Sequence, residues 1–84
     1  MVRLYGYDDC PFCKELKGYL DENSIKYKYV DVTLKEHKEE KEKIFELIGE
    51  EVVPVAIVGK KVLVPNRSFK TIKEGFELIN KLLK

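Results

Sequence analysis

The segment Cys10-Pro11-Phe12-Cys13 constrains this chain more than any other feature of the sequence. It follows an apolar stretch at residues 2–7 that is typical of a strand, and it precedes residues with helical spacing. The two thiols should therefore stand at the N-terminus of a helix, where free N–H groups and the helix dipole favour negative charge. A cysteine in that position gains thiolate character, because its pKa falls. Pro11 suits the first turn of such a helix, since its missing N–H would have no partner there.

This arrangement predicts a redox pair in which each thiol has its own role. We expect Cys10 to be the exposed nucleophile and Cys13, one helical turn later, to resolve the mixed disulfide that Cys10 forms. Asp8 and Asp9 precede the pair and should oppose a thiolate, whereas Lys14 should favour it. The sequence therefore predicts that Cys10 is acidified only moderately relative to a free cysteine.

A metal site is the main alternative use of the two cysteines. Zinc in a structural site takes four ligands, and the only other soft ligand in the chain is His37, within a run of charges. Zinc or an iron–sulfur cluster would thus require two chains to pool their C-x-x-C pairs, and Pro11 stiffens the loop against this. A structural disulfide across so short a loop would stabilise little. We favour redox chemistry without a bound metal, and we expect His37 to be a solvated surface residue.

Composition indicates which partners and which cellular compartment to expect. The chain has 84 residues, which is enough for one domain, and its 16 basic and 15 acidic residues give a net charge of +1. A net charge this close to zero produces no long-range electrostatic field that would attract nucleic acid or a membrane surface. The longest apolar run, at residues 52–58, is too short to span a bilayer and contains Pro54. No signal peptide opens the chain, so we expect a cytoplasmic protein, in a compartment where a C-x-x-C pair is more often catalytic than structural.

Hydrophobic periodicity predicts the element order β-α-β-α-β-β-α. Strands are expected at residues 2–7, 25–32, 52–58 and 61–64, and helices at 11–22, from 33 or slightly later to 48, and from 68 or 71 onward. These elements would form a four-stranded mixed sheet flanked by three helices, an α/β fold with a right-handed first crossover. The partly polar segment 25–32 should lie at an edge of the sheet, and the apolar segment 52–58 should lie in its interior.

Caps and turns mark the ends of the later elements. Thr33 could cap the second helix together with Glu36, and a tight turn is expected at residues 59–60. Ser68 could cap the last helix, with Thr71 as the rival cap. Gly75 lies inside that helix, where it would permit close packing.

The chain resembles the glutaredoxin family over essentially its whole length. The resemblance rests on chain length, element order, the C-P-F-C segment after the first strand and Val53-Pro54 before the third. It implies a thioredoxin-like fold, with residues 1–84 as a single glutaredoxin-like domain that performs thiol–disulfide exchange. By the same resemblance Pro54 would be cis, and the Val53 backbone, Pro11 and Phe12 would contact the substrate. No bound cofactor is implied, although glutathione is a possible co-substrate.

Several positions depart from the glutaredoxin pattern. The family usually has a threonine before the V-P pair, where this chain has Val52. It also has a Gly-Gly pair and then an aspartate that grip glutathione, where this chain has Val64-Pro65 and Ser68. Pro65 lacks an N–H donor, and Ser68 carries no charge that could hold an ammonium group. We expect Arg67 to face solvent rather than to pair with a ligand carboxylate.

These observations predict a monomeric dithiol oxidoreductase that reduces protein disulfides through Cys10 and Cys13. The altered glutathione loop leaves two electron donors open: glutathione itself, or a reductase of the thioredoxin-reductase type. A metal-binding dimer remains the alternative from another class.

Overall fold

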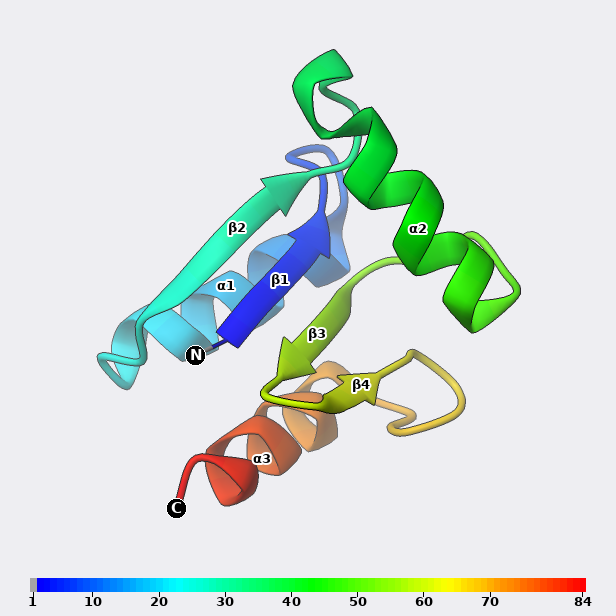
Figure 1. The fold of residues 1–84 in the computed structure, drawn as a ribbon. Coiled ribbons are helices and arrows are strands. Elements are labelled where there is room, and N and C mark those ends of the chain that lie inside the picture. The colour runs from blue at the N-terminus through cyan, green and yellow to red at the C-terminus, as the bar shows by residue number, and fades with distance from the viewer. Residues whose placement is uncertain (1) are drawn as a thin grey trace.

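Four short strands form one mixed sheet in the computed structural model, which describes residues 2–84 (Figure 1). The strand order is β2-β1-β3-β4. Strand β1 (Val2–Gly6) pairs in parallel with β2 (Tyr27–Asp31) and antiparallel with β3 (Val55–Val58), which in turn pairs antiparallel with β4 (Lys61–Leu63). The expected edge position of the second strand, the interior position of the third and the turn at residues 59–60 are all confirmed.

Three α-helices cover the two faces of this sheet. Helices α1 (Pro11–Glu22) and α3 (Ile72–Leu82) lie on one face, and α2 (Lys38–Ile48) lies on the other (Figure 1). A short 3₁₀ turn, η1 (Lys35–His37), precedes α2. The predicted α/β order with three helices is therefore confirmed.

Alternation along the strands divides the core into two layers. On the face of α1 and α3 the buried residues are Val2, Leu4, Leu16, Leu20, Ala56, Val58, Leu63, Phe69, Ile72 and Ile79. On the face of α2 they are Tyr5, Val30, Val32, Ile44, Ile48, Val55 and Val64. Successive strand residues point to opposite faces, so each strand supplies both layers. The Tyr19 and Phe76 rings stack 5.3 Å apart and join α1 to α3, while the Tyr5 hydroxyl donates a hydrogen bond of 2.8 Å to Glu40 on α2.

The second helix does not begin at a Thr33 cap but later, as the alternative of a later start predicts. The N–H and hydroxyl of Thr33 both donate to the Asp31 carboxylate, at 2.9 and 2.6 Å, and this local turn competes with helix capping. Helix α2 starts at Lys38, after η1. His37 is half-buried rather than solvated, and its Nδ1 lies 3.0 Å from the Asp31 carbonyl oxygen.

The structure also shows where the third strand starts and which residue caps the last helix. Strand β3 starts at Val55 rather than at residue 52, because Pro54 has no N–H to donate to the sheet. Thr71, and not Ser68, caps α3: the Glu74 N–H donates to the Thr71 hydroxyl at 3.2 Å, and the Glu74 carboxylate accepts from the Thr71 N–H in return.

Two glycines allow helices to approach the rest of the core closely. A Cβ on Gly6 would lie 2.6 Å from Cys13 Sγ, so α1 rests its second cysteine on the bare backbone of β1. A Cβ on Gly75 would lie 3.1 Å from the ring of Phe69, which confirms that Gly75 permits close packing of α3. The Gly6 contact is the tighter of the two and fixes the start of α1 against the sheet.

Replacement of Gly6 by alanine should therefore destabilise the reduced protein. We expect Gly6→Ala to lower the free energy of unfolding by about 1–3 kcal/mol, since the new methyl group must displace Cys13 or the strand. The matched control is Gly18→Ala in α1, where nothing lies within 4 Å of the added Cβ. That variant should gain up to about 1 kcal/mol from helix propensity. Chemical denaturation of the two variants checks the contrast, and equal stability would contradict it.

Candidate functional site

Cys10 and Cys13 stand at the N-terminus of α1, as the sequence predicts. Cys10 is the N-cap residue in an extended conformation, and Pro11 occupies the first helical position. The Cys13 N–H donates a hydrogen bond of 3.3 Å to Cys10 Sγ. Both cysteines are free thiols. The helix thus directs one of its unpaired N–H groups at the sulfur of Cys10, where that hydrogen bond would strengthen if the sulfur became charged.

The expectation that Cys10 is exposed is wrong for this reduced chain. Cys10 is 5% exposed and Cys13 is 0% exposed. The reason is the capping hydrogen bond, which turns the Cys10 side chain inward over the end of the helix. Cys10 therefore keeps only a small exposed area, while Cys13 has no contact with solvent.

The environment of Cys13 strongly favours its neutral thiol. Burial, followed by the hydrogen bond with Cys10, raises the pKa of Cys13 from an ordinary value of 9.0 to about 12. The positive charge of Lys17 acts in the opposite direction, but its effect is smaller. Cys13 therefore stays protonated at neutral pH and is a poor nucleophile until its proton is removed.

A cleft of about 420 Å³ opens beside the start of α1. Its wall contains Phe12, which is 60% exposed, together with Val53 and Pro54. The complete lining is Phe12, Glu15, Val52, Val53, Pro54, Pro65, Asn66, Phe69, Lys70, Thr71 and Ile72. The cis Val53-Pro54 bond implied by the resemblance is confirmed. The structure thus brings together three of the four predicted substrate-binding residues; the fourth, Pro11, is exposed on α1 and is not part of this wall.

A second hollow shares Val52 and Val53 with this cleft. It measures about 380 Å³ and is lined by Tyr7, Val32, Thr33, Lys41, Phe45, Glu51, Val52 and Val53. No local sequence pattern predicts this hollow, because its residues come from four separate segments. Val52 and Val53 thus line both hollows, and Phe12 of the C-P-F-C segment lines only the cleft of about 420 Å³.

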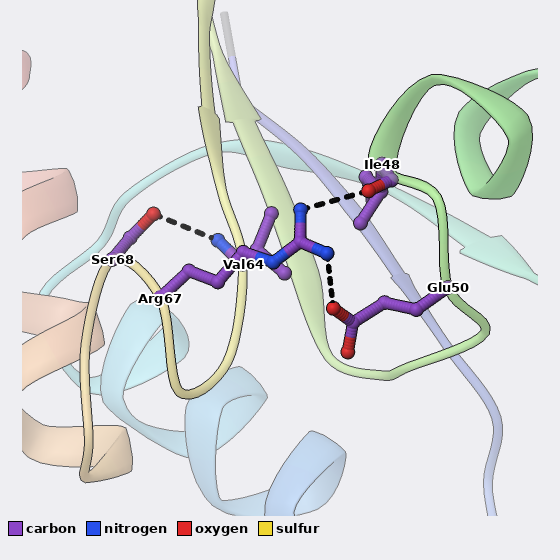
Figure 2. Close-up of polar contacts among 5 residues, drawn as sticks. All are labelled: Ile48, Glu50, Val64, Arg67 and Ser68. Atoms are coloured by element: carbon purple, nitrogen blue, oxygen red, sulfur yellow. Dashed lines mark hydrogen bonds and ion pairs between the residues drawn. The ribbon is translucent and has the colours of Figure 1, made fainter.

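Arg67 ties the loop after β4 to the end of α2 (Figure 2). Its Nη1 donates a hydrogen bond of 2.7 Å to the Ile48 carbonyl oxygen, and its Nη2 forms an ion pair with the Glu50 carboxylate. The neighbouring Ser68 hydroxyl accepts from the Val64 N–H at 3.0 Å. Arg67 is exposed, as the sequence predicts, but its guanidinium group is also engaged by the protein.

The described residues also bear on two other possibilities, a metal site and a membrane-spanning helix. Within residues 2–84, no three side chains among His, Cys, Asp and Glu gather closely enough to hold a metal ion. The two-chain metal site stays an alternative that metal analysis of the purified reduced protein would test. None of the helices described is both long enough and apolar enough to cross a membrane.

Comparison with known proteins identifies the family. Residues 2–63 match the family model described as glutaredoxin. Over 64 residues the chain is 31% identical to a glutaredoxin-like 8.6 kDa protein encoded in the rubredoxin operon of Clostridium pasteurianum; the match covers 76% of this chain and 83% of that protein. The chain belongs to the glutaredoxin family, whose members are generally thiol–disulfide oxidoreductases.

Solved structures show the same thioredoxin-type fold. The glutaredoxin from Archaeoglobus fulgidus superposes with a TM-score of 0.72 at 23% identity, covering 99% of this chain and 85% of its own. The NrdH-redoxin from Escherichia coli, a glutaredoxin-like protein with a thioredoxin-like activity profile, gives 0.67 at 20% identity, covering 96% and 92%. A buckwheat glutaredoxin in complex with glutathione gives 0.74 at 14% identity, covering 98% and 74%. At these identities the likeness establishes the fold alone.

The raised pKa of Cys13 predicts a loss of stability in alkali. From about pH 9 upward an unfolded chain loses the thiol proton that the folded chain retains up to about pH 12. The unfolded state is therefore increasingly favoured as pH rises, by up to about 1.4 kcal/mol per pH unit from this group. Urea denaturation of the reduced protein from about pH 8 to about pH 10.5, which covers the start of this change, should show a steeper decline in stability than in Cys13→Ala. Parallel declines in the two proteins would contradict the assignment.

Proposed function

We propose that this protein is a dithiol oxidoreductase that reduces protein disulfides through Cys10 and Cys13. The observation that carries the proposal is the hydrogen bond from the Cys13 N–H to Cys10 Sγ at the start of α1. This contact places one sulfur at the positive end of a helix and leaves the second thiol buried one turn behind it. The assignment of the chain to the glutaredoxin family supports the same chemistry.

The proposed cycle transfers two electrons in two exchange steps. The Cys10 thiolate attacks one sulfur of the substrate disulfide, which breaks the substrate S–S bond and releases the other sulfur as a thiolate. Cys13 then loses its proton and attacks the Cys10 sulfur. A Cys10–Cys13 disulfide forms, the mixed disulfide breaks, and the second substrate sulfur leaves with the bonding electron pair. The substrate is reduced to two thiols, and the protein is left oxidised.

The cleft beside Phe12 is the proposed seat of the substrate. Val53 and Pro54 form part of its wall next to the exposed ring of Phe12. An extended peptide could pair with the Val53 backbone, as in strand addition, while apolar side chains of the peptide cover Phe12. The rim also contains Glu15 and Lys70, so a peptide of mixed charge would be accepted.

We further propose that a reductase of the thioredoxin-reductase type, and not glutathione, recycles the oxidised protein. Glutathione presents an ammonium group and two carboxylates, but Arg67 is already held by Ile48 and Glu50, and the Ser68 hydroxyl is engaged by the Val64 N–H. Pro65 has no N–H to offer. The fold does not decide the matter, since the glutathione-bound buckwheat protein and the Escherichia coli NrdH-redoxin both superpose well. We also propose that the protein works in the cytoplasm, because thiols are kept reduced there. Its proposed working form is a monomer.

Serine substitutions should separate the roles of the two thiols. Cys10→Ser should abolish reduction of insulin disulfides by the protein, because no nucleophile remains. Cys13→Ser should still attack but should accumulate as a mixed disulfide between Cys10 and the substrate, visible by intact mass. Disulfide reduction by Cys10→Ser at the wild-type rate would overturn the proposal, as would accumulation of the adduct on Cys13.

Recycling of the oxidised protein tests the proposed donor. The Cys10–Cys13 disulfide should disappear quickly with NADPH and thioredoxin reductase, and at least about ten-fold more slowly with glutathione at millimolar concentration. Loss of the disulfide is followed by intact mass after alkylation of free thiols. Fast reduction by glutathione through an adduct on Cys10 would show that the altered loop still holds glutathione.

A further inference from the structure

The hydroxyl group of Tyr29 on β2 is buried without a hydrogen-bond partner. It is the one buried side-chain oxygen or nitrogen in residues 2–84 for which the structure provides no partner. Leaving a buried hydroxyl unpaired is costly, and a phenylalanine would fill nearly the same space without that cost. The hydroxyl is therefore free to donate a hydrogen bond to an acceptor that forms only in another state of the protein.

The position of this hydroxyl relates it to Cys13. A Cβ built on Gly6 would lie 2.6 Å from Cys13 Sγ and 3.4 Å from the Tyr29 hydroxyl oxygen. The sulfur of α1 and the phenol of β2 thus border the same small space above the bare backbone of Gly6. Gly6 and Tyr29 come from adjacent, parallel strands, and α1 lies across both of them on this face (Figure 1).

Lys17 completes the cluster from α1. Its ammonium group lies 4.1 Å from the centre of the Tyr29 ring, which is the range of a cation–π contact. Lys17 follows Cys13 by one helical turn, so both side chains project from the same side of α1. A positive charge above the ring also makes the phenol a stronger hydrogen-bond donor.

The other charged groups around the cluster keep the phenol protonated. Burial raises the pKa of Tyr29 well above its ordinary value of 10.0, and the charges of Cys13, Asp8, Asp31 and Cys10 raise it further. Tyr29 therefore retains its proton at neutral pH and acts as a donor rather than as a base. Cys13, in contrast, must lose its proton in the resolving step, and its burial disfavours the thiolate.

We propose that the Tyr29 hydroxyl, with Lys17 over its ring, donates a hydrogen bond to Cys13 Sγ as that sulfur becomes a thiolate in the resolving step. The inference rests on the proposed dithiol function and adds a residue to it. The Cys13 proton passes to the departing substrate thiolate, the S–S bond to Cys10 forms, and the bond from Cys10 to the substrate breaks. Tyr29 keeps its own proton throughout, so no further reactant is needed.

Reaction of the reduced protein with 5,5′-dithiobis(2-nitrobenzoate) observes the two steps separately. Attack by Cys10 releases the first coloured thiolate, and attack by Cys13 on the adduct releases the second. Tyr29→Phe should slow the second release by about ten-fold or more and leave the first unchanged, since a hydrogen bond to a charged group is lost. Lys17→Met should slow the second release in the same direction.

Tyr27→Phe is the matched control on the same strand. Tyr27 packs against the same core, but its hydroxyl already donates to Asp21 at 3.0 Å. It should leave both releases unchanged. Tyr29→Phe should also move the pH midpoint of the second release upward and should melt no lower than the wild type, because the hydroxyl it removes is unpaired.

The outcomes distinguish this inference from the proposed function. A second release that is unchanged in Tyr29→Phe, or that is slowed equally in Tyr27→Phe, would overturn the role of Tyr29 alone. A single release from the wild-type protein, or a fast first release from Cys10→Ser, would instead overturn the dithiol function itself.

Discussion

The contact between Cys13 and the bare backbone of Gly6 is the constraint on which the rest of the site depends. It holds the first turn of α1 against β1, with the Cys13 sulfur 2.6 Å from the point where a Cβ on Gly6 would stand. This placement buries Cys13, directs its N–H at Cys10 and leaves Cys10 to cap the helix. The asymmetry between the thiols follows: one is bound to a helix terminus, and the other is held as a neutral thiol away from water.

The second constraint is the connection between loops that meet around the cleft. Arg67 joins the loop after β4 to the carbonyl end of α2 and to Glu50, just before the segment that leads to Val53 and Pro54 (Figure 2). The exposed ion pair contributes little stability, about 0–1 kcal/mol. The hydrogen bond to the Ile48 carbonyl has a different consequence, because it satisfies a helix end and holds the guanidinium group within the protein. Loops thus set the shape of the cleft at this edge of the protein, while α1 positions the two cysteines.

Much of the fold follows from the sequence, since periodicity and turn residues are local signals. The order of the elements, the edge position of β2 and the place of the C-P-F-C segment are all confirmed. The errors arise where one local interaction competes with another: Thr33 bonds to Asp31 instead of capping a helix, and Thr71 caps α3 in place of Ser68. The inward turn of Cys10 and the pairing of Arg67 depend on contacts across the fold, which no local pattern contains.

The central claim is that the two thiols have unequal roles, and their alkylation rates test it most directly. The reduced protein would be treated with iodoacetamide at neutral pH, and the modified sites would be located by peptide mass analysis over time. We predict that Cys10 is modified first, while Cys13 stays protected until the protein is unfolded, because Cys13 is buried as a neutral thiol. Modification of Cys13 first, or of both at equal rates, would contradict the account.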